Sequence, residues 1–490
     1  MVQAANESNV LDPQRWGLPL EAVEELAERL RRIWSRFRFC FWTKTSDAGE
    51  YAYHYLRGIL TMETDRNYAN IARRVIDLDD DGQGLQHCMS DSPWSAQAVF
   101  DQIQVEICQR PELSDGMLTL DESGDRCAGD QKAGAGRQWL GRFGKVDMGQ
   151  VGVGAGYYKD GNWAMVDVRL FMIEDWFDDE HAELRKRWHV PDDLVYKTKL
   201  ELALEMVKQA KENGLPFEVV GCDDLYGRSK EFRASLDGEH IIYMADVPVD
   251  TPVYLEKPVV GVPETPPDKK GPPFSRPRVL SDDEPVEVRD VAKRSDTVFQ
   301  TVEVRHIERG VLIHPCAARR VWTVTKDGKV REEWLFIRRE SDGSLSYSLS
   351  NAPEDTPLKK LALWRSWRYF AERIFQDAKS ETGWDELEAR KYRAWLHHTA
   401  LIALALWFVA ETKLDWAKEH PRDPELVEQL KVEVLPTLSV ANVCELLRAV
   451  LPLKQLSPEE ATRLVVKHLV NRSRSTSCRL KKQRAGRSPP

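Results

Sequence analysis

Three acidic residues of this sequence stand where a cluster of carboxylates could form. Asp121 and Asp223 each follow a short apolar segment with strand character, and Glu372 lies within a segment with helical spacing. Carboxylate oxygens are the ligands that hard divalent cations such as Mg²⁺ prefer. Two such cations, roughly 3.5–4 Å apart, support the breaking and joining of phosphodiester bonds. The three acids therefore define a candidate site for two-metal-ion chemistry.

Each acid taken alone has a more ordinary explanation. The chain contains 79 Asp and Glu residues, and most carboxylates of proteins are solvated surface groups or helix caps. Asp224 directly follows Asp223 and competes with it for the same role. Arg368, four residues before Glu372, is equally explained by a salt bridge along one helix. Position alone therefore does not select these acids.

The elements that must position the acids follow the order of an RNase H-like mixed sheet. Apolar and β-branched runs predict strands, a Lys-Asp-Gly turn at 159–161 predicts a hairpin, and an amphipathic run predicts a helix. The expected fold class is α+β and multidomain, with an RNase H-like mixed-sheet catalytic core. The strands are expected at 117–121, 149–158, 163–172, 217–222 and 240–245, and the helix at 194–213.

The rest of the chain divides by composition. Residues before the first strand have helical spacing, residues 263–277 are rich in proline, and alternating runs between 298 and 350 predict a small β-rich insertion. Strong helical runs follow. We expect a helical N-terminal domain (1–114), a first part of the core (115–250), a β-rich insertion with a Pro-rich linker (251–355), a second part of the core with the helix of Glu372 (356–412), and a C-terminal helical region with a basic tail (413–490).

Composition places the chain among globular proteins. The net charge is −9 and the hydrophobic content is 42%. The eight cysteines are scattered without a CxxC pair, which disfavours a disulfide framework or a zinc site and fits a reducing cytoplasm. The most apolar run, Thr399–Ala410, is short of the ~20 residues that span a bilayer, so we expect a buried helix and no membrane partner.

The residues around the first acid resemble a known family. The segment Leu120–Gly124, followed by Arg137–Val153, closely resembles the first catalytic block of transposases of the insertion sequence 701 family. That family belongs to the larger class typified by insertion sequence 4. The resemblance covers about residues 30–470.

The second and third acids stand in matching blocks. Asp223 is followed three residues later by Tyr226-Gly227, as in the family's second block, and Arg368, Glu372 and Lys379 reproduce the Arg-x3-Glu-x6-Lys spacing of the wider class. One departure is Arg365, where the wider class usually has a tyrosine; another is Arg373, where the family often has a second acid.

The resemblance implies a DDE-type DNA transposase with Asp121, Asp223 and Glu372 as catalytic and metal-binding residues. It implies two Mg²⁺ ions, with Mn²⁺ as a substitute. The enzyme would bind terminal inverted repeats, cleave the transposon ends and join the 3′-hydroxyl to target DNA, as a homodimer on double-stranded DNA. Two alternatives stay open: an RNase H-like metal-dependent endonuclease without strand transfer, and a domesticated, non-catalytic DNA-binding protein. The intact set of acids disfavours the second.

Basic residues outside the acids are candidates for DNA contact. Arg368 and Lys379 share a helix face with Glu372 and could contact phosphates. Basic residues interleaved with aromatic ones suit a phosphate-tracking surface, although such a helix could equally form the N-terminal core. The tail from residue 471 is basic and has no acid. The further candidates are Arg31, Arg32, Arg36, Arg38, Arg137, Lys145, Lys481 and Lys482.

Overall fold

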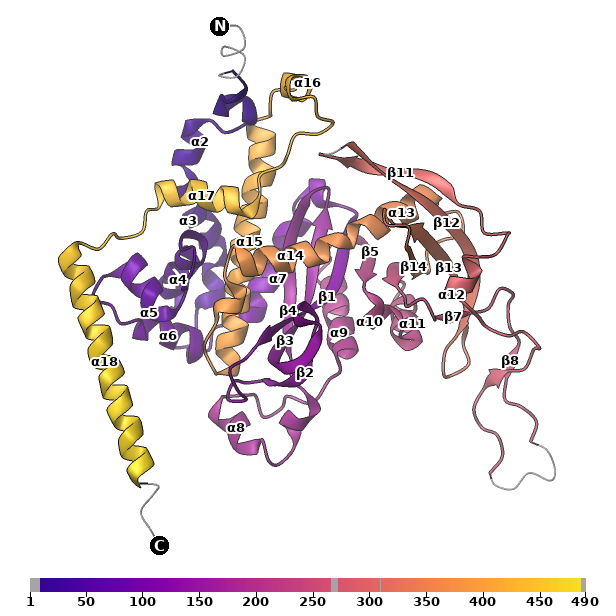
Figure 1. Cartoon of the computed structure of the whole chain (residues 1–490), viewed down its shortest axis with the longest axis horizontal. Coiled ribbons are helices and arrows are strands. Elements are labelled where there is room, and N and C mark those ends of the chain that lie inside the picture. The colour runs from indigo at the N-terminus through magenta and orange to yellow at the C-terminus, as the bar shows by residue number, and fades with distance from the viewer. Residues whose placement is uncertain (1–8, 266–271, 309, 486–490) are drawn as a thin grey trace.

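The computed structural model describes residues 9–265, 272–308 and 310–485 (Figure 1). Parts of the expected N-terminal domain, Pro-rich linker and basic tail (1–8, 266–271, 309 and 486–490) lie outside these residues. Within them, one ten-stranded sheet has the order β11-β12-β13-β14-β6-β5-β1-β3-β2, and β4 pairs with β3. Parallel and antiparallel pairs are both present, with helices around them. This confirms the expected α+β fold with an RNase H-like mixed sheet.

The catalytic part of the sheet centres on β1. β1 pairs in antiparallel fashion with β3 on one side and in parallel fashion with β5 on the other. β5 in turn pairs in parallel with β6. These strands are β1 (Gly116–Arg126), β2 (Gly136–Leu140), β3 (Lys145–Lys159), β4 (Asn162–Phe171), β5 (Phe217–Cys222) and β6 (Tyr243–Asp246).

The strands of the expected insertion continue this sheet. β14 joins β6 through two residue pairs, Ser348 with Asp246 and Leu349 with Ala245. The added strands are β11 (Gln300–Ile307), β12 (Gly310–Val324), β13 (Val330–Arg339) and β14 (Leu345–Ser350). Short elements precede them: β7 (Pro252–Val253), β8 (Val260–Gly261), β9 (Arg278–Val279), β10 (Val286–Glu287) and α12 (Val288–Val291).

The N-terminal region is helical, as its spacing predicts. Ser95 begins one helix by accepting a hydrogen bond from the backbone N–H of Ala98 at 3.1 Å, a standard N-cap. The elements are η1 (Pro13–Trp16), α2 (Leu20–Glu24), α3 (Leu26–Phe37), η2 (Arg38–Phe41), α4 (Gly49–Thr61), α5 (Tyr68–Ile71), η3 (Ala72–Ile76), α6 (Gln83–Ser90), α7 (Ala96–Cys108) and η4 (Pro111–Leu113).

The remaining helices lie between the strands and at the C-terminal side. Thr198 and Glu201 form a capping box at the start of the long helix α9. The elements are η5 (Gly141–Phe143), η6 (Glu174–Phe177), α8 (Ala182–Arg187), α9 (Lys199–Glu212), α10 (Asp224–Gly227), α11 (Lys230–Gly238), α13 (Leu358–Trp367), α14 (Tyr369–Ser380), η7 (Trp384–Glu386), α15 (Tyr392–Glu419), α16 (Glu425–Leu430), α17 (Val440–Val450) and α18 (Pro458–Ala485).

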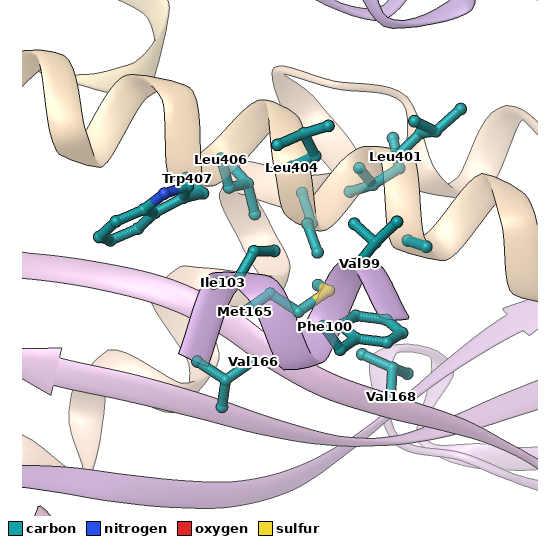
Figure 2. Close-up of a cluster of buried hydrophobic side chains, with 14 of the residues drawn as sticks. Val99, Phe100, Ile103, Met165, Val166, Val168, Leu401, Leu404, Leu406 and Trp407 are labelled. Carbon is teal, nitrogen blue, oxygen red and sulfur yellow. The ribbon is translucent and has the colours of Figure 1, made fainter. Parts of the chain in front are cut away.

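The main core lies where α15 and α7 pack against β4. α15 is long and apolar enough to cross a membrane by length and composition, but 94% of its most apolar window is buried inside the protein. The expectation of a buried helix over Thr399–Ala410 is therefore confirmed. Figure 2 shows the contact between the three elements, formed by Val99, Phe100, Ile103, Met165, Val166, Val168, Leu401, Leu404, Leu406 and Trp407.

Candidate active site

The register of the sheet brings the two aspartates to one edge. The parallel pairing of β1 with β5 ends at Leu120 opposite Cys222, so Asp121 and Asp223 are the next residues of the two strands. The sequence led us to expect that Asp121 ends its strand, but it does not. β1 continues to Arg126 because residues 121–126 stay paired with β3. Only the partner on the β5 side stops there.

Asp223 leaves the sheet through a helix cap. Its carboxylate accepts a hydrogen bond from the backbone N–H of Leu225 at 3.1 Å and begins the short helix α10. Gly227, at the end of this helix, does not use the left-handed backbone that glycine permits, because it is not among the glycines with positive φ. A β-carbon at Gly227 would instead clash with the backbone carbonyl of Asp246.

Glu372 reaches the same edge from α14, which lies across the strands (Figure 1). Glycines of β3 make room for this helix. A β-carbon at Gly154 would stand 2.6 Å from the ring of Phe375, and one at Gly156 would clash with Ile374. The alternating glycines of β3 therefore let α14 approach the sheet closely. The Glu372 side chain itself is 62% exposed.

Arg368 lies between the acids. Its Nη2 is 2.9 Å from Oε1 of Glu372, which is the expected salt bridge along one helix. Its Nη1 is 3.8 Å from Oδ2 of Asp121, so the same guanidinium also approaches the first aspartate. Lys379, two turns after Glu372, places its Nζ 2.6 Å from Oδ1 of Asp125 on β1. Both cations thus join α14 to the strand of Asp121.

One cleft contains all of these side chains. It has a volume of about 840 Å³ and is lined by Asp121, Asp223, Glu372, Arg368 and Lys379 among others. Trp139 on β2 also lines it, and 53% of Trp139 is exposed. The three predicted acids, Arg368 and Lys379 therefore face one cavity, with an accessible aromatic side chain beside them.

The two aspartates hold protons unusually strongly. Burial, followed by the negative charge of Asp223, raises the pKa of Asp121 to about 7, and the Arg368 guanidinium opposes this. Burial also raises the pKa of Asp223 to about 6, with Arg368 opposing and with Glu122 and Asp224 adding to the rise. Two buried carboxylates that repel each other at a cleft form a strongly electronegative site.

The donor set fits a hard divalent cation at the two aspartates. A cation there would neutralise both buried carboxylates and remove the repulsion that raises their pKa values. In the described residues, no three His, Cys, Asp or Glu side chains form a ready-made ligand group. Glu372 is paired with Arg368. To join the two aspartates as a ligand, Glu372 would have to release that arginine.

Sequence reasoning missed a fourth acid, Asp246, at the end of β6. Its Oδ2 is 2.9 Å from Nε of Arg368 and its Oδ1 is 2.8 Å from Nε of Arg365. Ser348 on β14 donates a hydrogen bond to the same carboxylate at 2.7 Å. The available signal was that Asp246 directly follows the predicted strand 240–245, as Asp223 follows its own strand.

The N-terminal arginines do not lie in the cleft. Arg36 bridges the buried carboxylates of Glu106 and Glu411, at 2.7 Å from each. Arg31, Arg32 and Arg38 are partly exposed, and each is paired with an acid of the same region: Glu50, Glu28 and Asp47, respectively. The helix therefore contributes Trp34 and Phe37 to the N-terminal core, and Arg36, whose side chain is 41% exposed, covers the two buried acids.

The other predicted basic residues lie on exposed surfaces. Arg137 is exposed on β2, and Lys145, at the start of β3, is 3.2 Å from Asp147. Lys481 is exposed on α18, which extends away from the other helices (Figure 1). The side chain of Lys482 lies outside the described part of the structure.

Comparison with known proteins places this chain in a family. The sequence model of the DDE superfamily endonucleases matches residues 36–311, more than half of the chain. The chain belongs to the DDE superfamily of endonucleases. Asp121 and Asp223 lie within the matched residues of this endonuclease, whereas Glu372 lies beyond them.

A curated relative points in the same direction. The chain is 28% identical over 213 residues to a protein of Microchaete diplosiphon described as a probable transposase for insertion sequence element IS701. The match covers 43% of this chain and 52% of that protein, so the chain spans about half the length of the curated relative.

Proposed function

We propose that this DDE endonuclease is a DNA transposase that cleaves transposon ends and joins the freed 3′-hydroxyl to target DNA. The observation that carries the proposal is the placement of Asp121, Asp223 and Glu372 in one cleft with Arg368 and Lys379. Membership of the endonuclease family and similarity to a probable transposase support it. Asp121 and Asp223 are proposed as the principal metal ligands, and Glu372 completes the set.

The residues of the cleft have distinct roles in this proposal. Two Mg²⁺ ions, or Mn²⁺ in their place, supply Lewis-acid polarisation of the scissile phosphate when bound. Arg368 and Lys379 flank the acids and hold the phosphate backbone in line. In cleavage, water adds to phosphorus as the bond to the 3′-oxygen breaks. In joining, that 3′-hydroxyl adds to a target phosphate, its proton departs, and the target's own 3′-oxygen leaves.

DNA would approach the cleft along the β2–β3 hairpin. Arg137 and Lys145 are exposed there, and Trp139 offers an aromatic face at the rim of the cleft. Positive charge contacts phosphates regardless of sequence, and aromatic rings stack on unpaired bases. The basic half of α18, with Lys481, forms a second proposed contact for double-stranded DNA, and pairing of two ends calls for a homodimer on DNA.

A combined cleavage and joining assay tests the function. Purified protein is incubated with Mg²⁺ and DNA that carries the inverted repeats flanking its gene, and both nicked ends and joined products are measured. We expect both products from the wild type and neither from Asp223→Asn. Asp224→Asn is the control at the neighbouring acid and should still give both products. Cleavage without joined product would favour the endonuclease alternative. Undiminished cleavage by Asp223→Asn would show that the assigned site is wrong.

A further inference from the structure

We propose that Asp246 is a positioning residue that holds Arg368 away from Asp121, so that this carboxylate stays available to a divalent cation. The inference rests on the proposed function, because it concerns the same acids. It adds a fourth acid to the site, with a role that differs from that of a ligand.

The surroundings of Asp246 fix it in place as an ion-pair partner of Arg368. Its carboxylate is only 14% exposed and has three partners, namely Arg365, Arg368 and the hydroxyl of Ser348. The backbone of Asp246 is fixed as well, because Gly227 packs directly against its carbonyl. A residue whose backbone and carboxylate are both held keeps a defined position in which a guanidinium can pair with it.

The guanidinium of Arg368 lies close to more than one carboxylate. Its Nε lies 2.9 Å from Asp246, whereas its Nη1 lies 3.8 Å from Asp121, beyond hydrogen-bonding distance. Among the described residues, Nε and Nη1 are both buried without an aligned hydrogen bond, so the contact of Nε with Asp246 is an ion pair. Nη2 donates a hydrogen bond to Glu372 at 2.9 Å. The guanidinium is therefore held between Asp246 and Glu372, while its Nη1 is close to Asp121 without pairing fully with it.

Removing the charge of Asp246 would change this balance. The positive charge of Arg368 is only 13% exposed and needs a carboxylate nearby. Without Asp246, Arg368 would pair more closely with Asp121, from which its Nη1 is now 3.8 Å, and that pairing would compete directly with a metal ion. Arg365 has the opposite role, since its ion pair with Asp246 draws part of that negative charge away from Arg368.

The test measures metal binding by itself, from the electron paramagnetic resonance signal of free Mn²⁺ during titration of the full chain. We expect Asp246→Asn to weaken Mn²⁺ binding about tenfold, the scale of effect seen when partners of metal ligands are removed. In the background of Arg368→Gln, the same substitution should change Mn²⁺ binding less than about twofold, because the competing cation is gone. Equal Mn²⁺ binding by wild type and Asp246→Asn, or equal weakening in both backgrounds, would overturn the inference.

Two further variants keep the test decisive. Ser348→Ala loosens the same carboxylate without removing it, and we expect a smaller weakening in the same direction should Asp246→Asn fail to fold. Unchanged Mn²⁺ binding by Ser348→Ala would then count against the inference. Asp223→Asn separates the proposed metal site from the proposed role of Asp246. If it retains Mn²⁺ binding, the proposed site itself fails; if it abolishes binding while Asp246→Asn does not weaken it, only the role of Asp246 fails.

Discussion

Gly227 and Asp246 are in direct backbone contact. The carbonyl of Asp246 fills the space that a β-carbon on Gly227 would need. The backbone at the end of α10 and the backbone at the end of β6 are therefore in close contact. This contact gives a structural reason for the glycine of the Tyr-Gly pair that follows the second aspartate. The glycine sets the distance between the strand of Asp223 and the acid that holds Arg368.

The first prediction concerns this contact. Gly227→Ala forces the two backbones apart, and we expect the free energy of unfolding to fall by about 3 kcal/mol, the upper range for overpacking. Gly238→Ala is the matched control, because Gly238 ends helix α11 and no atom of the described residues lies within 4 Å of the β-carbon that the substitution adds. Urea denaturation measures both. A Gly227→Ala protein as stable as Gly238→Ala would contradict the close packing.

The second prediction concerns pH in metal-free buffer. The pKa of Asp121 is raised to about 7 from 3.8, so the folded state holds this proton more strongly than the unfolded state. Its contribution to stability is complete below pH 3.8 and is lost as pH rises through about 7, on the order of 4 kcal/mol. Asp121→Asn should therefore be more stable than the wild type at pH 8 in EDTA.

The same variant gives the metal arm of this experiment. Added Mg²⁺ should stabilise the wild type at pH 8 and leave Asp121→Asn nearly unchanged, because ligand binding to the folded state raises its stability. The melting temperature measured with EDTA and with Mg²⁺ reports both effects. An Asp121→Asn protein that is less stable than the wild type at pH 8 in EDTA would contradict the electrostatic origin of the raised pKa.

The third prediction assigns Arg36 to structure. Its guanidinium bridges Glu106 and Glu411, whose side chains are only 6% and 7% exposed. Arg36→Met should lower the free energy of unfolding by about 2 kcal/mol or more, because the buried carboxylates lose a partner. Arg32→Met removes only an exposed pair, and we expect a change within about 0.5 kcal/mol. If Arg36→Met left stability intact and weakened DNA binding, a direct contact of Arg36 with DNA would be favoured.

The fourth prediction concerns α18. Replacing Arg472, Arg474 and Lys481 by glutamine should weaken binding to duplex DNA. The slope of log affinity against log salt should become less steep by roughly 2–3, about one unit for each phosphate that the protein no longer neutralises. Ser473→Ala with Ser475→Ala is the control on the same helix. Fluorescence anisotropy at several salt concentrations gives the slope. An unchanged slope would remove α18 from the DNA-binding surface.

The sequence predicted most strands and helices because their apolar periodicity is local information. It also selected the three acids, through the blocks that surround them, and the fold brings them to one cleft; their role as metal ligands stays a prediction. The extent of β1 could not be predicted in the same way, since the strand continues past Asp121 only because β3 remains beside it. Pairing between strands depends on register, which no single segment contains.

The partners of charged residues were the other part that local sequence could not determine. Arg36 contacts acids 70 and 375 residues away along the chain, and Arg365 contacts Asp246 across the sheet. Nothing near these arginines distinguishes an ion pair inside the protein from a contact with phosphate. Only the fold brings the acids to them.

The junction between β14 and β6 gives the molecule a mechanical property. The strands of the insertion meet the strands of the acids at β14 and β6, and one of the two residue pairs between these strands contains Asp246. A cluster of buried side chains, with Met244 of β6 and Phe336 of β13 among them, also joins the two parts, so that they are mechanically continuous. A load that DNA places on β11–β14 would therefore reach the carboxylate that pairs with Arg368, so that load on the insertion and charge balance at the acids vary together.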